Sequence, residues 1–401
     1  MTLPLIVYRS LRQHALSTVI TAAGIALACG LLMCVWMVKT QSQAAFTQTT
    51  TGFDAVLGAR GSKLQLVLNA IFHLEASAGN IAAADVEAIR KHAMIKTAIP
   101  IAVGDNLRGF RLVGTVPELF SSVEYAPGKK FALEPGGKLF APEAKQAVAG
   151  SFAAQRLRLK VGDTFRPFHG LAFDPKAEHA DDFTVTGILA PTNTPADRVI
   201  WIPLRGLQTM GGHDPKAATD VSAVLLQLRA PMGGFMLDML YNKQGNRLTF
   251  AYPVGAIIAE LFSKISWFDQ VLALVAYVVA LVAAGSVLAS IYNSMSARQR
   301  DLAILRALGA RRRTIFGAVL AEAACIGVLG AAAGFVVYFA LFAGVAHLIR
   351  VQTGVVLSLG AGHPVLWICP LAMIAGCALG GVVPALKAYR TPVAETLAPV
   401  S

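Results

Sequence analysis

The chain has 401 residues, of which 55% are hydrophobic and only 14% are charged, and its formal net charge is +12. A soluble domain carries about 25% charged residues. The deficit here is concentrated in a few stretches, which indicates membrane spans rather than an apolar soluble core. The positive charge does not indicate nucleic-acid binding, because no basic patch is interleaved with aromatic residues and the densest basic cluster adjoins apolar stretches.

Four apolar stretches are long enough for a helix to cross a bilayer, which takes about 20 residues. We expect these helices at 16–38, 269–293, 314–341 and 364–385. The first stretch is longer than the apolar core of a signal peptide, about 7–15 residues, so we expect a retained anchor. Together they predict an α-helical membrane protein with four transmembrane helices.

Basic residues near the span ends predict the orientation, because cytoplasmic loops are rich in Lys and Arg. Arg9 and Arg12 lie in the amphipathic segment 1–15, and Lys387 and Arg390 lie in the tail 386–401. The loop 298–313 holds six arginines, whereas the loop between the third and fourth spans holds only Arg350. Both termini and the Arg-rich loop are therefore expected in the cytoplasm, and 40–266 on the outer side.

The inserted domain at 40–266 has the pattern of a mixed α/β fold, and its length of about 225 residues suits two subdomains. Apolar residues at helical spacing predict helices at Ser62–Glu75 and Ala83–His92. Expected strands are Phe110–Thr115, Ala147–Ser151, Phe183–Leu189, Arg198–Ile202 and Val221–Leu228.

The five cysteines lie outside this domain, in apolar stretches, at Cys29, Cys34, Cys325, Cys369 and Cys377. The domain therefore has neither a disulfide framework nor a thiolate zinc site. We expect the five thiols to be buried structural groups.

The chain has no phosphate-binding G-x-x-x-x-G-K-[ST] loop, no G-x-S-x-G elbow and no H-E-x-x-H motif. We therefore expect no enzyme activity and no directly bound cofactor in this chain. If ATP and Mg are used, a partner ATPase must bind them.

One loop of the inserted domain gathers potential metal ligands. They are His169, Asp174, Glu178, His179, Asp181 and Asp182. Nitrogen and oxygen ligands of this kind bind zinc, but the spacing matches no specific metal motif. We therefore expect a solvated loop and no metal.

Within the spans, Glu322 is a charged residue in the third apolar stretch, where acids are expensive and often functional. Pairs of glycines at four-residue spacing let helices approach closely. These pairs are Gly330 with Gly334 and Gly376 with Gly380. We expect packing or assembly roles, either within one chain or across a dimer.

The loop 298–313 contains a short predicted helix with an apolar ridge. Leu302, Leu305 and Leu308 recur at a spacing of three, and Gly309 is placed to end the helix. Two interpretations remain open: a helix that lies in the lipid headgroups, or a helix that docks in a groove of a cytoplasmic partner.

This segment resembles the short helix R-x-x-E-[IL]-A-[IV]-L-[RK]-A-[LI]-G-A of the FtsX-like, MacB-like permeases of ABC transporters. The resemblance assigns ATPase coupling to Asp301, Leu302, Ile304, Leu305, Arg306, Leu308 and Gly309, with Asp301 in place of the usual Glu. Glu322, Gly327, Gly330 and Gly334 are similar to the family's E-x-x-x-x-G-x-x-G-x-x-x-G pattern.

The resemblance extends over most of the chain. Residues 148–165 are similar to the family's periplasmic-core signature and 384–397 to its P-A-x-x-A-x-x-x-x-P-x-E-x-L ending. Two further motifs are similar to those of a subgroup: F-D-x-x-x-G-x-x-G-S, from Phe53 to Ser62, and A-P-T-x-T-x-x-D-R, from Ala190 to Arg198.

The resemblance implies an inner-membrane permease whose periplasmic domain has the MacB-core fold. It also implies a homodimer with separate ABC ATPase subunits, which moves its outer domains to export or extract a lipoprotein, peptide, haem or antimicrobial. It leaves open a periplasmic or outer-membrane partner. A regulator that relays ATPase action to a cell-wall enzyme, and a sensor without an ATPase, are the alternatives.

Overall fold

The computed structural model describes residues 3–48, 52–170, 173–211, 219–297, 310–353, 356–358 and 362–390. The chain forms two compact units. The helical unit comprises Met1–Gln41, Ile265–His347 and Ser358–Ser401, and the α/β unit comprises Ser42–Lys264 and Leu348–Leu357.

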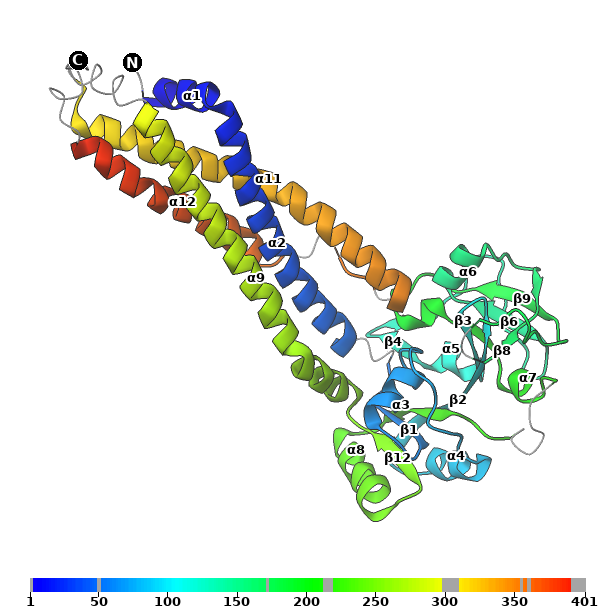
Figure 1. The fold of residues 1–401 in the computed structure, drawn as a ribbon. Helices are drawn as coiled ribbons and strands as arrows, with labels where there is room; N and C mark the ends of the chain where they lie inside the picture. The colour runs from blue at the N-terminus through cyan, green and yellow to red at the C-terminus, as the bar shows by residue number, and fades with distance from the viewer. Residues whose placement is uncertain are drawn as a thin grey trace. The chain divides into compact units, whose positions relative to one another are not determined.

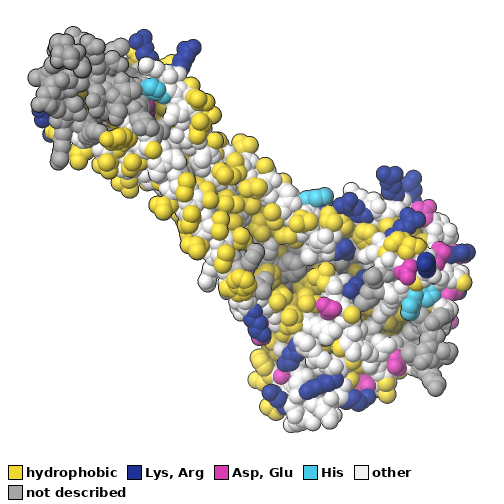
Figure 2. Space-filling view, in the orientation of Figure 1, with side chains coloured by type: hydrophobic (Ala, Val, Ile, Leu, Met, Phe, Trp, Pro, Cys, Tyr) yellow, Lys and Arg dark blue, Asp and Glu magenta, His cyan; other side chains and the backbone are white. Residues whose placement is uncertain are grey.

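In the described part of the chain, the helical unit is built from five helices (Figure 1). They are α1 (Leu3–Gln13), α2 (Ala15–Gln48), α9 (Val254–Ala297), α11 (Arg312–Thr353) and α12 (Val365–Arg390). Of these, α2, α9 and α11 extend into the α/β unit. Their exposed side chains are mostly hydrophobic, whereas charged side chains are spread over the α/β unit (Figure 2). An apolar surface on a helix bundle is expected where the surrounding solvent is lipid.

Among the described residues, three helical segments are long and apolar enough to cross a membrane: Ala15–Ala45, Arg312–Thr353 and Val365–Leu386. The second predicted span, 269–293, lies within α9, where the apolar stretch Gln270–Ser286 is shorter. The count of four spans therefore stays a prediction. At the other three positions, α2 and α11 extend beyond the predicted bounds at both ends, and α12 extends beyond them at its carboxyl end.

One mixed sheet runs through the α/β unit, in the strand order β12-β1-β11-β2-β3-β10-β6-β9-β7, with β8 paired to β2. Its strands are β1 (Ala55–Ala59), β2 (Ile95–Leu107), β3 (Phe110–Thr115), β6 (Gln146–Ala149), β7 (Thr164–Phe165), β8 (Phe168–His169), β9 (Phe183–Ile188), β10 (Ile200–Pro203), β11 (Ala223–Leu228) and β12 (Leu248–Ala251). A separate hairpin joins β4 (Glu124–Ala126) to β5 (Lys129–Lys130).

Short helices connect and cover these strands (Figure 1). They are α3 (Lys63–Ala70), α4 (Ala83–Arg90), α5 (Glu118–Ser122), α6 (Ser151–Leu157), α7 (Leu204–Gln208) and α8 (Pro231–Asp238). A 3-10 helix, η1 (Pro195–Arg198), precedes β10, and a π-helix, η3 (Met239–Gln244), follows α8.

Strand β2 is shared by both halves of the sheet. Its first part pairs with β11 through Ile95–Ile101, and its second part pairs with β3 and β8 through Ala102–Leu107. This strand was not predicted from the sequence, where Pro100 and Gly104 are strand breakers. Proline has no backbone N–H to donate. It is tolerated at position 100 because the pairing of β2 with β3 begins only at Ala102.

The predicted elements of the domain are present with shifted ends. Strand β3 has the predicted bounds, whereas the predicted helix Ser62–Glu75 ends at Ala70, and His73 adopts a left-handed conformation (φ 54°). The predicted strand Ala147–Ser151 ends at Ala149, and Ser151 instead begins α6. Predicted strand residue Arg198 belongs to η1.

Candidate functional site

The predicted ATPase-coupling helix lies outside the described residues. This holds for Asp301, Leu302, Ile304, Leu305, Arg306, Leu308 and Gly309. Arg312 is the first residue of α11, and its guanidinium lies 5.6 Å from the centre of the Tyr389 ring in α12. This contact brings the end of the Arg-rich loop next to the end of the last helix.

Glu322 is placed against the amino-terminal helix. The hydroxyl of Ser10 in α1 donates a hydrogen bond to the Glu322 carboxylate, and Ser10 is only 3% exposed. The acid thus has a polar partner within the helical unit, which lowers the cost of placing it in the span. Its functional role stays a prediction.

Three of the predicted glycines lie at close helix contacts. A Cβ added at Gly330 would lie 2.6 Å from Ile25 Cβ in α2, and one at Gly334 would lie 3.0 Å from Cys29 Cβ. A Cβ added at Gly327 would lie 3.0 Å from Cys377 Cβ in α12. Side chains at these positions would force the helices apart.

The second predicted pair has a different environment. A Cβ added at Gly376 meets none of the described atoms within 4 Å, and one at Gly380 meets only Ala284 O, at 3.9 Å. Gly30 of α2, which was not predicted, is a further close contact: an added Cβ would lie 2.6 Å from Val337 Cβ. The spacing of Ala26 and Gly30, small residues four apart, is the feature that could have identified it.

The first subgroup motif, Phe53 to Ser62, builds the start of the α/β core. Asp54 accepts a hydrogen bond from the backbone N–H of Leu228 (2.8 Å). A Cβ added at Gly58 would lie 2.4 Å from a methyl group of Leu66 in α3. Ser62 caps the amino terminus of α3. These contacts give the motif a structural role.

The second subgroup motif forms a loop closed by Asp197. Its buried carboxylate accepts hydrogen bonds from the backbone N–H groups of Thr192 (3.0 and 3.1 Å) and Asn193 (2.8 Å) and from the Thr192 hydroxyl (2.7 Å). Burial raises the pKa of Asp197 although these hydrogen bonds lower it. A Cβ added at Gly150 would lie 2.4 Å from Asp197 O, so the loop requires glycine there.

The same loop contacts the last turn of α11. The Arg198 guanidinium donates a hydrogen bond to the Gln352 carbonyl oxygen and lies 5.8 Å from the centre of the Phe110 ring. The Arg350 guanidinium lies 5.7 Å from the centre of the Phe152 ring in α6. These contacts explain why Leu348–Leu357 belongs to the α/β unit.

Two of the six potential ligands in the loop, His169 and His179, lie beside a carboxylate from another part of the chain, that of Asp105. Asp105 Oδ1 lies 3.3 Å from His169 Nδ1 and 3.2 Å from His179 Nε2. One ligand atom from each of the three residues lies within 4.8 Å of the other two. Asp105 is fully buried, the side chain of His179 is 6% exposed and that of His169 is 60% exposed.

The four loop acids are not part of this cluster. Asp181 pairs with Lys145 and accepts a hydrogen bond from Gly211 N–H (2.8 Å), and these two partners lower the pKa of its carboxyl. Asp182 pairs with Arg166. The Asp174 carboxylate accepts a hydrogen bond from the backbone N–H of Lys176 (3.0 Å), and Glu178 is exposed.

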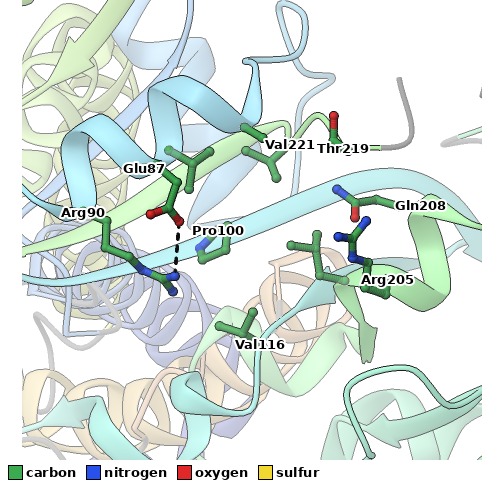
Figure 3. Close-up of a pocket in the computed structure, with 11 residues that line it drawn as sticks. Glu87, Arg90, Pro100, Val116, Arg205, Gln208, Thr219 and Val221 are labelled. Atoms are coloured by element: carbon green, nitrogen blue, oxygen red, sulfur yellow. Dashed lines mark ion pairs between the residues drawn. The ribbon is translucent and has the colours of Figure 1, made fainter. Parts of the chain in front are cut away.

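A pocket of about 290 Å³ lies between α4 and α7 (Figure 3). Glu87 and Arg90 of α4 line one side, where they form an ion pair at 3.5 Å, and Arg205 and Gln208 of α7 line the other. The floor is apolar and includes Pro100. These residue types do not define a reaction or a ligand.

Two family models match the chain. The MacB-like periplasmic core domain matches residues 18–231, which is more than half of the chain, and the FtsX-like permease C-terminal model matches residues 273–393. No curated protein matches the chain.

Among solved structures, the chain is similar to the periplasmic region of MacB from Actinobacillus actinomycetemcomitans, with 11% identity and a TM-score of 0.36 over 54% of this chain and 94% of that chain. It is also similar to the extracellular domain of the noncanonic ABC-type transporter YknZ from Gram-positive bacteria, with 15% identity and a TM-score of 0.31 over 49% of this chain and 97% of that chain.

The two family models follow one another along the chain in the order expected from the sequence motifs, and their descriptions name a periplasmic core and a permease. Permeases of this family work with ABC ATPase partners. The chain belongs to the FtsX-like, MacB-like family of ABC-transporter permeases.

Proposed function

We propose that this permease couples ATP hydrolysis in a separate ATPase subunit to movement of its periplasmic domain, and so exports or extracts a hydrophobic substrate such as a lipoprotein, peptide, haem or antimicrobial. In this proposal the protein is a multi-pass inner-membrane homodimer with four spans per chain, and both termini lie in the cytoplasm. The chain itself binds neither ATP nor Mg.

The observation that carries the proposal is the continuity of α11. This helix begins at Arg312, at the end of the Arg-rich loop, and runs without interruption to Thr353. A helix of this length measures about 63 Å, about twice the ~30 Å thickness of the hydrocarbon core. Its last turn is held by Arg198 and Phe152 of the α/β unit. Movement at the cytoplasmic end would therefore reach the outer domain through one element.

The proposed input is the segment Asp301–Leu308, docked in a groove of the ATPase through Leu302, Leu305 and Leu308. Central apolar anchors dominate interfaces of this kind. Leu305→Asp is therefore expected to abolish co-purification of the ATPase while the permease still inserts and dimerises. Leu305→Met, which keeps an apolar side chain of similar volume, is the matched control. Full ATPase binding by the Leu305→Asp protein would refute docking and leave the ridge in the headgroups.

The proposed output is tested separately at Arg198. In the purified complex, binding of a non-hydrolysable ATP analogue is expected to change hydrogen exchange in the Ala190–Arg198 loop. Arg198→Ala should abolish that change and retain ATPase binding. Arg166→Ala, which removes a surface ion pair elsewhere in the same unit, is the control. An unaltered response in Arg198→Ala would contradict transmission through α11.

A further inference from the structure

We infer that Asp105, His169 and His179 form a zinc-binding site in the α/β unit. This replaces the expectation of a loop that is only solvated. It does not depend on the transport function proposed above. The inference rests on the donor types, the distances between the donor atoms and the hydrogen bonds that orient them.

The donor set suits a borderline divalent cation. Two imidazole nitrogens and one carboxylate oxygen are ligands of zinc sites that keep one position open. Ligand atoms 2.0–2.1 Å from a tetrahedral zinc ion lie about 3.3 Å apart. The separations from Asp105 Oδ1 are 3.3 Å to His169 Nδ1 and 3.2 Å to His179 Nε2. Calcium and magnesium prefer sites made of oxygen ligands alone.

The backbone brings the three side chains together. Asp105 and His169 are directly paired in the antiparallel ladder of β2 and β8, so their side chains lie on one face of the sheet. The chain then turns back: His169 N–H donates to Ala177 O (2.6 Å), and His179 N–H donates to Pro167 O (2.8 Å). The positions of both histidines beside Asp105 are thus set by main-chain hydrogen bonds.

The orientation of the His179 ring follows from its second nitrogen. Nδ1 lies 2.7 Å from Gly211 O, and a carbonyl oxygen only accepts, so Nδ1 carries the proton. In neutral His179, Nε2 then presents a lone pair toward Asp105 Oδ1. These two atoms lie 3.2 Å apart, a separation at which both can be ligands of one cation. Donation of the other ring N–H to a backbone carbonyl is also the usual support of a metal-bound histidine.

Neighbouring residues hold this arrangement. Asp181 accepts a hydrogen bond from the N–H of Gly211 (2.8 Å), the residue whose carbonyl oxygen accepts from His179. The side-chain amide of buried Asn106 donates to Phe168 O (3.3 Å) and Gly170 O (2.9 Å), on either side of His169. His169 is exposed, so a zinc ion can enter from solvent and a water molecule or substrate group can take the fourth position.

Zinc binding is measured on the full-length chain in detergent, with any affinity tag removed and metal stripped with a chelator that is then removed. Calorimetric titration with Zn²⁺ is expected to show one ion per chain, and Ca²⁺ should not compete. His169→Gln and Asp105→Asn should each weaken binding at least about 100-fold, because each removes one of three ligands. Glu178→Gln, beside His179 in the chain but outside the cluster, should leave the affinity unchanged.

Thermal unfolding and X-ray absorption give two further tests of zinc binding at this site. Zn²⁺ should raise the melting temperature of the wild-type chain, since a ligand of the folded state stabilises it, and should not raise that of His169→Gln. This variant alters an exposed side chain, so it decides the matter even if Asp105→Asn does not fold. X-ray absorption should show nitrogen and oxygen ligands at about 2.0–2.1 Å and no sulfur at about 2.3 Å.

Three results would overturn the inference. The first is no Zn²⁺ binding by the wild-type chain, which would leave the cluster as charged or hydrogen-bonded His–Asp pairs. The second is binding that survives both His169→Gln and Asp105→Asn. The third is a sulfur ligand in the absorption spectrum, which would move the ion to the cysteines of the helical unit.

Discussion

His73 illustrates how burial alters one side chain of the α/β unit. Its ring packs edge-on against that of Trp201, a residue of the hydrophobic core, with 5.6 Å between the ring centres. The pKa of His73 is lowered from 6.5 to about 3, mainly by burial and secondly by the positive charge of Arg111. The hydrogen bond to the Asn69 backbone acts in the opposite direction but is the smallest of the three effects. His73 is therefore neutral in the folded protein.

This predicts a specific loss of stability in acid. Above pH 6.5 His73 is neutral in both states and its contribution is complete. As the pH falls below 6.5, His73 becomes protonated in the unfolded chain but stays neutral in the folded chain. The free energy of unfolding therefore decreases by up to about 1.4 kcal/mol per pH unit. The loss from this group reaches about 3 kcal/mol near pH 4 and ends near pH 3.

The measurement is urea unfolding of the full chain in detergent, followed by Trp201 fluorescence after Trp36, Trp267 and Trp367 are replaced by Phe. His73→Gln removes the titrating group, so its stability should fall less steeply between pH 6.5 and pH 4. The other histidines are present in both proteins and cancel in the comparison. Equal slopes for the two proteins would show that His73 does not stay neutral on folding.

At the scale of elements, α11 packs through small residues. Gly330 and Gly334 allow α2 to approach at Ile25 and Cys29, and Gly327 allows α12 to approach at Cys377. Apolar side chains gain little from mutual burial in lipid, so close backbone contact and dispersion take over as the main stabilising interactions. A glycine without a close neighbour contributes no such contact.

This contrast predicts different responses at two predicted glycines. Gly330→Ile should lower the melting temperature in detergent, because overpacking costs about 1–3 kcal/mol and its Cβ would collide with Ile25. Gly376→Ile, on α12, should leave the chain folded, since its added Cβ meets none of the described atoms within 4 Å. Equal destabilisation by both substitutions would mean that the contacts of α11 do not hold the helices together.

At the scale of the whole molecule, the distribution of Lys and Arg along the chain predicts its orientation in the membrane. Arginines gather beside the predicted cytoplasmic ends of the spans, and the α/β unit follows the first span. The family models agree with this order, with a periplasmic core at 18–231 before a permease region at 273–393. The side of each loop stays a prediction.

Cysteine labelling tests the orientation. In a variant whose five native cysteines are replaced by Ala, Lys160→Cys should react with an impermeant maleimide on intact spheroplasts, because Lys160 is exposed on the α/β unit. Arg306→Cys should react only after permeabilisation, since its loop is expected in the cytoplasm. The opposite labelling pattern would reverse the predicted topology.

The sequence by itself determined those features that depend on neighbouring residues. Long apolar stretches predicted the helices α2, α11 and α12, because transfer into lipid is governed by the composition of a continuous segment. Alternation predicted β3 with its bounds. Motifs from Leu302 to Ala310 and from Val148 to Phe165 predicted the family that the two models show.

Tertiary structure alone decided which distant residues meet. Strand β2 was missed because Pro100 and Gly104 argue against a strand locally, whereas pairing with β11, β3 and β8 stabilises one. Asp105 lies on that strand, so its place beside His169 and His179 depends on a register between segments far apart in the chain. Register is set by the whole sheet, so the loop sequence alone does not show that Asp105 lies beside the two histidines.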